Sequence, residues 1–416
     1  MMPRVTQPFI VNDFNVNLKR RMQELQKTQH NLASGFRINL PSDDPVGTII
    51  FMDYDSRIKE INTYERIIEN ATSKLKLIDS SLDSATTILQ RLRELAIQGA
   101  NGTYTKEDRQ KMAVEVDQLL RELLQIANSY YKDLPLFGGT TISGAPFKPH
   151  FKVDEQTGIE FLEDVRYIGN NQAQILEVER GEKVDITPPG NQIFWAENME
   201  IYSTLNVSGY VADRDSKIVI DGVEISIHAG DNIEIIADKI NQAGLAVKAS
   251  IQTVEGQSYF ALETTSPHQI SLMDINGGTV LRDLGIIDHG MYPPNNYSPA
   301  AKVYTGSIFD VMINFRKALL NDDVFQIGGR AVIGLDNSIG NLLKYRAHVG
   351  AVNIRLDKIY ERLTSDYVYT EEAKQNTIAT DIAKATMDLK SLEFSHDVAL
   401  NVGARILPRT LLDFLR

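Results

Sequence analysis

Residues 61–96 read INTYERIIENATSKLKLIDSSLDSATTILQRLRELA and carry the clearest pattern in this chain of 416 residues. Apolar residues recur every seven positions, and a second apolar series follows three positions after the first. The two series are Ile61, Ile68, Leu75, Leu82, Leu89 and Ala96, and Tyr64, Ala71, Ile78, Ala85 and Leu92. This spacing is typical of a helix that packs lengthwise against another helix. It predicts a bundled helix from about Val46 to Gln98.

The same spacing returns near both ends of the chain. The C-terminal series are Leu342, Tyr345, Val349, Val352, Leu356, Ile359 and Leu363, and then Ile378, Ile382, Ala385, Leu389 and Leu392. A weaker N-terminal series is Val11, Phe14, Leu18, Leu25 and Leu32. Residues 10–128 and 306–416 are therefore predicted to form long helices, with a first helix over about 11–34 and a third helix that begins after the capping sequence at Thr105.

The middle of the chain lacks the helical period. Asp221-Gly222 separates two short runs of β-branched residues, which is a strong hairpin signal. A short helix capped by Asp231 follows, and strands are predicted at about 246–253 and 258–264. These elements form a predicted ββαββ insertion between the helical parts.

The predicted fold class is α+β and multidomain. Long N- and C-terminal helices form a coiled-coil bundle, and the centre is a β-rich domain with the ββαββ insertion. The expected parts are an N-terminal helical part, a β-rich connection, the inserted module and a C-terminal helical part that packs with the first. Their predicted ranges are 1–135, 136–200, 201–298 and 299–416.

Composition argues against several classes of partner. The net charge is −12 and basic residues are interspersed with acids, so no nucleic-acid partner is expected. No apolar run is long enough to cross a membrane, so no membrane insertion is expected, and Met1-Met2-Pro3-Arg4 lacks the apolar core of a cleavable signal. The absence of cysteine removes disulfides and thiolate ligands.

Motifs for catalysis are also missing. The seven histidines form no HExxH pair, and neither a phosphate loop nor a GxSxG nucleophile turn occurs. The acid pairs Asp43-Asp44 and Asp322-Asp323 could suggest acid–base work or cation binding, but Asp44 precedes Pro45 at a helix start, where capping explains it. We therefore expect no enzyme activity and no catalytic, cofactor or metal site.

Residues 32–47, LASGFRINLPSDDPVG, resemble the N-terminal signature of the bacterial flagellin superfamily. Residues 100–103 and 137–139 are similar to its helical turn and glycine hairpin, and 346–351 and 381–385 to its C-terminal helix motifs. The inserted module is similar to an insertion found in many of its members. The resemblance implies a structural, motility-related component of the bacterial flagellum with a flagellin-like helical bundle.

Two details indicate a particular role within that superfamily. The sequences at 41–45 and 412–415 resemble the hook-associated junction proteins, which join the hook to the filament. A flagellin-type filament subunit is the alternative. An alternative of another class is a coiled-coil tail or adhesin component, which would not be expected to carry both terminal signatures.

The resemblance further implies partners and a location. These are self-association in a ring or helical layer, the proximal hook-associated junction protein, flagellin and an export chaperone, with no cofactor. The chain would be exported by the flagellar type III apparatus to a site outside the inner membrane, either extracellular or, as in spirochaetes, periplasmic.

The residues expected at the assembly interface are apolar residues of the terminal helices and polar residues of the segment after the first helix. They are Val11, Phe14, Leu18, Leu25, Leu32, Arg37, Asn39, Asp43, Asp44, Ile382, Leu389, Leu392, Leu400, Leu412, Phe414 and Leu415. For each apolar residue, packing within one chain is the alternative interpretation. For the segment from Arg37 to Asp44, which could connect inner and outer shells, the alternative is a capped helix junction.

Overall fold

The computed structural model describes residues 7–142, 144–153, 160–254, 256–288 and 293–406. The chain folds as two compact units. Unit 1 comprises residues 1–65 and 360–416, and unit 2 comprises residues 66–359. The four part boundaries expected from the sequence remain predictions.

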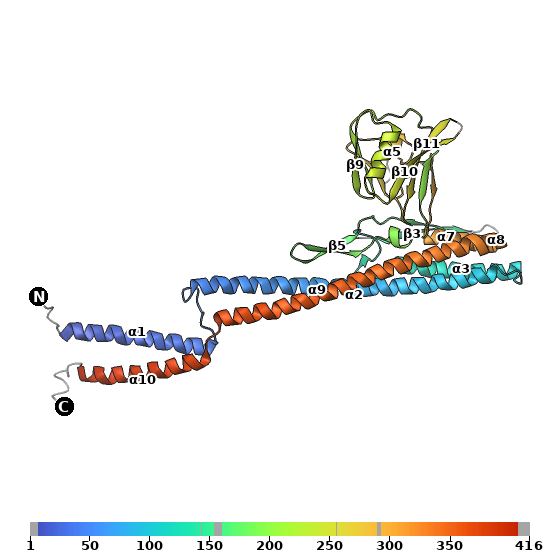
Figure 1. The fold of residues 1–416 in the computed structure, drawn as a ribbon. Helices are drawn as coiled ribbons and strands as arrows, with labels where there is room; N and C mark the ends of the chain where they lie inside the picture. Colours follow the sequence, from blue (N-terminus) through green and yellow to red (C-terminus); the bar gives the residue numbers. More distant parts are fainter. Residues whose placement is uncertain (1–6, 143, 154–159, 255, 289–292, 407–416) are drawn as a thin grey trace. The chain divides into compact units, whose positions relative to one another are not determined.

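Unit 1 is made of helices. It contains α1 (Gln7–Ser34), the start of α2 (Pro45–Gly99), the end of α9 (Val332–Ile378) and α10 (Ile382–Ile406). Figure 1 shows α1 and α10 lying side by side. α2 and α9 are joined here by Lys374, whose Nζ lies 3.1 Å from Asp55 Oδ1.

The heptad prediction is confirmed by burial. The series that begins at Ile61 is buried through to Ala96, and so are Leu342, Val349, Leu356 and Leu363 of α9. In unit 2, α2 and α9 run antiparallel, since Arg346 Nε bonds Asp79 at 2.9 Å and Arg93 Nε bonds Asp336 at 2.5 Å. These apolar seams hold the bundle together.

A third helix, α3 (Lys106–Ala127), begins as predicted. Thr105 is its N-cap, and Thr105 and Asp108 form a reciprocal capping box. α3 packs against α7 (Ile308–Leu320), and a buried ion pair joins Asp117 of α3 to Arg316 of α7. α8 (Val324–Gln326) and a π-helical turn (Ile327–Ala331) lead into α9.

The β-rich connection consists of hairpins and one short helix. Their bounds are β1 (Tyr130–Tyr131), β2 (Leu134–Pro135), β3 (Phe147–Val153), β4 (Glu160–Tyr167), β5 (Gln174–Glu179), β6 (Glu182–Thr187) and α4 (Gly190–Ile193). Buried phenylalanines fix the connection to α7: Phe194 lies 5.2 Å from Phe147 and 6.0 Å from Phe309 between ring centroids. We call these hairpins and α4, residues 130–193, the base.

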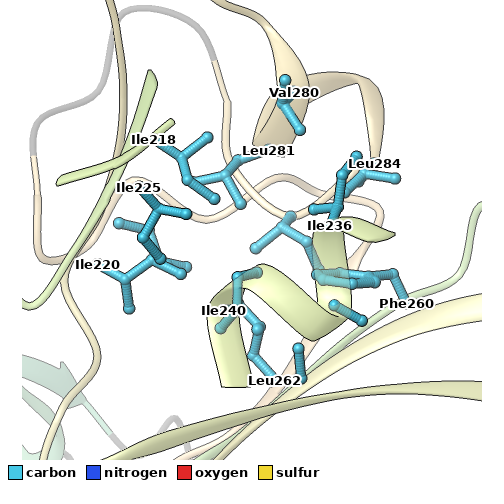
Figure 2. Close-up of a cluster of buried hydrophobic side chains, with 14 of the residues drawn as sticks. Ile218, Ile220, Ile225, Ile236, Ile240, Phe260, Leu262, Val280, Leu281 and Leu284 are labelled. Carbon is cyan, nitrogen blue, oxygen red and sulfur yellow. The ribbon is translucent and has the colours of Figure 1, made fainter. Parts of the chain in front are cut away.

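Two sheets and two short helices make up the inserted module, a name used below for residues 200–304. Its elements are β7 (Glu200–Ser203), β8 (Ser216–Ile220), β9 (Val223–Ile227), α5 (Ile233–Gln242), β10 (Val247–Val254), β11 (Gln257–Thr264), β12 (Leu272–Ile275), α6 (Val280–Asp283) and β13 (Ala301–Tyr304). The strand orders are β10-β11-β7-β13 and β12-β8-β9. Figure 2 shows Ile236 and Ile240 of α5 in one core with Ile220 and Leu262 from the two sheets.

The fold class and the ββαββ order are confirmed, with two refinements. The hairpin turns at Asp221-Gly222 as predicted, but the two hairpins belong to different sheets. The helix cap is Asn232 and not Asp231, because the Asn232 side chain accepts from the backbone N–H of Ile235. Asp231 instead accepts from the N–H of His228 and binds Lys239.

Candidate assembly interface

The pair of helices α1 and α10 meets along an apolar seam. Phe14, Leu18, Leu25 and Leu32 of α1 are half-buried, and so are Leu389 and Leu392 of α10, while Ala385 is buried. The structure therefore brings together six of the predicted interface residues in one chain. Arg21 Nη1 adds a bond of 3.1 Å to the carbonyl oxygen of Ser395 across the pair.

Close approach of the two helices depends on Gly403. A Cβ added at this position would lie 2.3 Å from Cζ of Phe14, so the phenylalanine ring occupies the space that the glycine leaves. No side chain of α1 from residue 12 to residue 34 is buried, although Phe14, Leu18, Leu25 and Leu32 are each half-buried. A two-helix pair thus leaves this apolar surface only half covered.

A second apolar face of α10 is uncovered. Met387, Phe394 and Val398 are 66%, 71% and 43% exposed. At about 100° per residue these three lie within about 40° of one another, on the side of α10 away from Ala385 and Leu392. Sequence reasoning missed this face, although the spacing of seven and then four residues was the signal that could have found it.

The remaining predicted apolar residues are placed differently or not described. Ile382 and Leu400 are exposed on α10. Val11 lies in α1, but its side chain is outside the described part of the structure. Leu412, Phe414 and Leu415 lie outside the described residues.

The segment between α1 and α2 is held by its own polar side chains. Asp43 Oδ2 accepts from the backbone N–H groups of Asn39 at 3.2 Å and Leu40 at 3.0 Å, and Asp43 Oδ1 binds Lys27 Nζ at 2.8 Å. The lysine and the two N–H groups together lower the pKa of Asp43 to about 2. Asn39 Nδ2 donates to Asn31 Oδ1 at 2.8 Å and so ties the segment back to α1.

Asp44 links the same segment to the start of α2, and Arg37 links it to the end of α9. Asp44 Oδ1 accepts from the N–H of Gly47 at 2.9 Å, and Asp44 Oδ2 binds Arg37 Nη1 at 3.1 Å. The Gly47 N–H and the guanidinium lower the pKa of Asp44. Arg37 Nη2 also donates to the carbonyl oxygen of Thr377 at 3.1 Å. Asp44 therefore caps α2, and Arg37 joins the segment to the end of α9.

An open groove lies beside this segment. Its volume is about 390 Å³, and its walls include Phe36, Leu40, Phe51, Met52 and Ile378. Phe36, Leu40 and Met52 are exposed. The groove is mainly apolar, so it offers surface for contact and not a set of reacting groups.

The described residues also lack the patterns of metal sites and membrane-spanning helices. Within them, no three histidine, aspartate or glutamate side chains gather as metal ligands would. None of the described helices carries an apolar stretch long enough to cross a membrane.

Two family patterns match the chain. The bacterial flagellin N-terminal helical region matches residues 10–133, and the flagellin hook IN motif matches residues 204–266. The second match falls on the inserted module.

Individual relatives agree with these matches. The polar flagellin C of Vibrio parahaemolyticus is 23% identical over 412 residues, which cover 96% of each chain. The flagellin FlaB1 of Treponema pallidum is 39% identical over 106 residues, covering 26% of this chain and 37% of that protein.

One similar solved structure is flagellar hook-associated protein 3 from Legionella pneumophila. Its TM-score is 0.45 and its sequence identity is 17%, and the alignment covers 78% of this chain and 97% of that chain. Another is a putative flagellar hook-associated protein from Vibrio parahaemolyticus, with a TM-score of 0.47 and 14% identity over 81% and 100% of the two chains. The family patterns and the relatives support a structural flagellar protein that carries the flagellin N-terminal helical region and the flagellin hook IN motif.

Proposed function

We propose that this chain belongs to the flagellin superfamily and joins the flagellar hook to the filament by polymerising through its terminal helices. The observation that carries the proposal is that α10 has two apolar faces, of which α1 covers one. Met387, Phe394 and Val398 on the other face are exposed. Clustered exposed apolar side chains on a helix usually mark a surface that another protein covers.

Burial of these faces would drive assembly. Removing apolar surface from water contributes roughly 25 cal/mol per Å², so contact with neighbouring copies stabilises the polymer more than the isolated chain. α1 and α10 offer different surfaces, and contacts between different surfaces propagate into rings or helical layers. We propose that the interface includes Val11, Ile382, Leu400, Leu412, Phe414 and Leu415 beside the seam residues.

The polar segment after α1 has a supporting role in this proposal. Asn39, Asp43 and Asp44 fix the loop and the groove beside it through the bonds described above. Arg37 keeps about half of its side chain exposed, at 53%, while it binds Asp44. We propose that Arg37 reaches a neighbouring subunit from this fixed position.

The choice of a junction role rests on sequence motifs. Residues 41–45 and 412–415 resemble those of hook-associated proteins. The second candidate is a filament subunit, and the observation that favours it is the alignment with the polar flagellin C of Vibrio parahaemolyticus along 96% of both chains. For the junction role, the partners are the proximal hook-associated junction protein, flagellin and an export chaperone. The exported chain would then assemble outside the inner membrane.

Deletion of the gene tests the junction role. Electron microscopy is expected to show hooks without filaments, with flagellin released into the medium. Filaments of normal number and length in the deletion strain would contradict the proposal. Purified protein that grows long filaments alone would support the filament subunit instead.

Complementation of that strain tests the uncovered face of α10. Phe394→Asp is expected to leave the monomer folded, because the side chain is exposed, and to fail to restore filaments. Thr386→Asp places the same charge at another exposed position of α10 and is expected to restore them. Equal complementation by both variants would exclude this face from the interface.

A further inference from the structure

One buried histidine lies where the inserted module meets the base. His268 belongs to the connection between β11 and β12 and is 6% exposed. Its Nδ1 lies 2.8 Å from the carbonyl oxygen of Ser266, and its Nε2 lies 2.9 Å from Asp221 Oδ2. A carbonyl and a carboxylate can only accept hydrogen bonds, so the ring satisfies both contacts only when both nitrogens carry a proton.

Asp221 ties three segments together. Its Oδ1 accepts from the N–H of Ser271 at 2.9 Å, and its own N–H donates to the carbonyl oxygen of Ser271 at 2.9 Å. The same Oδ1 accepts from Asn171 Nδ2 of the base at 3.3 Å. The carboxylate thus links the β8–β9 turn, the segment that carries His268, and the base.

The neighbouring Gln269 makes a second connection from that segment to the base. Its N–H donates to the carbonyl oxygen of Asn191 at 3.1 Å, and Asn191 Nδ2 donates back to the carbonyl oxygen of Gln269 at 3.0 Å. Any movement of the His268 segment would therefore disturb a reciprocal pair of bonds between module and base.

We propose that a proton on His268 fastens the inserted module to the base, and that loss of this proton loosens the contacts of Asp221 and Gln269 with Asn171 and Asn191. When the ring is neutral, one nitrogen lone pair faces an oxygen atom at hydrogen-bond distance. That repulsion destabilises the contact between the β8–β9 turn and the segment that carries His268.

The charges around the ring support this arrangement. Burial lowers the pKa of His268, but the hydrogen bond and the charge of Asp221 outweigh burial, and the net pKa is raised. Of the residues that line the small cavity here, only Asp221 can supply a negative charge near neutral pH. Burial raises the pKa of Tyr345 of α9 in the same cavity and that of Tyr297 near Asp221, so both stay neutral.

The direction of the pH dependence follows from the thermodynamic linkage between proton binding and stability. A histidine whose pKa is raised by folding contributes its full stabilisation below its ordinary pKa of about 6.5, and the contribution is lost as pH rises through the raised value. The contact between module and base should therefore be tight in mild acid and looser in mild alkali.

Amide hydrogen exchange of the full chain measures this contact. The Gln269 N–H bonds the base, whereas the Thr264 N–H bonds the carbonyl oxygen of Met199 at 2.9 Å. Met199 packs in the core of the module, so the Thr264 amide serves as the reference. After correction for intrinsic exchange, protection of Gln269 relative to Thr264 is expected to fall several-fold between pH 6 and pH 9. A constant ratio over this range would overturn the proposal.

Two variants separate this histidine from others. His268→Gln is expected to abolish the pH dependence, whereas His228→Gln, which changes an exposed histidine 3.7 Å from Asp215, is expected to keep it. An unchanged pH dependence in His268→Gln would also overturn the proposal. If that variant does not fold, NMR titration of the His268 ring in the wild-type chain tests the proposal instead. A titration midpoint at or below the ordinary histidine pKa of about 6.5 would contradict the proposed role of the His268 proton.

Discussion

The ring of Phe14 in α1 lies against the backbone of Gly403 in α10, so close that a Cβ at position 403 would come within 2.3 Å of the ring. This relationship joins residues 389 positions apart in the sequence, the difference between 403 and 14. It sets the separation of the two terminal helices that carry the proposed interface.

Gly403→Val should force the two helices apart or push the ring out of the seam. Overpacking of this kind costs about 1–3 kcal/mol. Faster amide exchange in α1 and α10 would show the loss. Ser391→Val, at an exposed position of α10, is the control, and the double variant Gly403→Val/Phe14→Ala should recover part of the protection. Unchanged exchange in Gly403→Val would show that the contact does not set the spacing.

Leu389→Asp should separate α1 from α10. The side chain is half-buried in the apolar seam, where burial of a carboxylate is costly. We expect a soluble monomer that fails to restore filaments in a deletion strain. Sedimentation and electron microscopy measure the two effects, with Thr386→Asp as the control. Normal filaments in the Leu389→Asp strain would contradict the role of the seam.

The segment after α1 should be sensitive to strong acid. The pKa of Asp43 is lowered to about 2 by Lys27 and by the N–H groups of Leu40 and Asn39. Its contribution is therefore present above the ordinary aspartate pKa of about 3.9 and is lost as pH falls toward 2. Exchange of the Asn39 and Leu40 amides should accelerate in that window. Asp43→Asn should show fast exchange already at neutral pH, and Asp53→Asn in α2 should not.

The buried pair of Asp117 and Arg316 should be costly to break from one side. Their side chains are 7% and 4% exposed, and Arg121 also binds Asp117 at 2.9 Å. Asp117→Leu leaves a buried guanidinium and should lower the free energy of unfolding by about 3–5 kcal/mol. Arg316→Met should cost less, because Arg121 still partners Asp117. Urea unfolding measures both.

The double variant Asp117→Leu/Arg316→Met provides the matched comparison, since it removes both charges. It should be more stable than Asp117→Leu alone. Strictly additive losses would show that the two side chains do not act as a pair.

The sequence predicted the helices well because their signals are local. Heptad spacing from Ile61 onward, the cap at Thr105 and the turn at Asp221-Gly222 each depend on residues a few positions apart, and each is confirmed. The cap at Asn232 was misplaced by one residue because aspartate and asparagine are equally good caps there, and only the hydrogen bonds distinguish them.

The candidate site was only partly accessible from sequence. Leu389 and Phe394 are both apolar residues of α10, but Leu389 is half-buried and Phe394 is exposed. This difference depends on which distant segment packs against each side of the helix. The sequence indicated that Arg37 and Asp44 matter, but the bond of Arg37 to the carbonyl oxygen of Thr377 depends on the meeting of the two ends of the chain.

Local sequence patterns were enough to predict long bundled helices at both ends, a β insertion between them and a flagellin-type signature, because periodicity, turns and motifs depend on neighbouring residues. Tertiary structure alone decided that α1 covers one apolar face of α10, leaves Phe394 exposed and places Phe14 on Gly403. Those outcomes depend on which distant surfaces meet, and the free energy that selects them comes from contacts that no local pattern encodes.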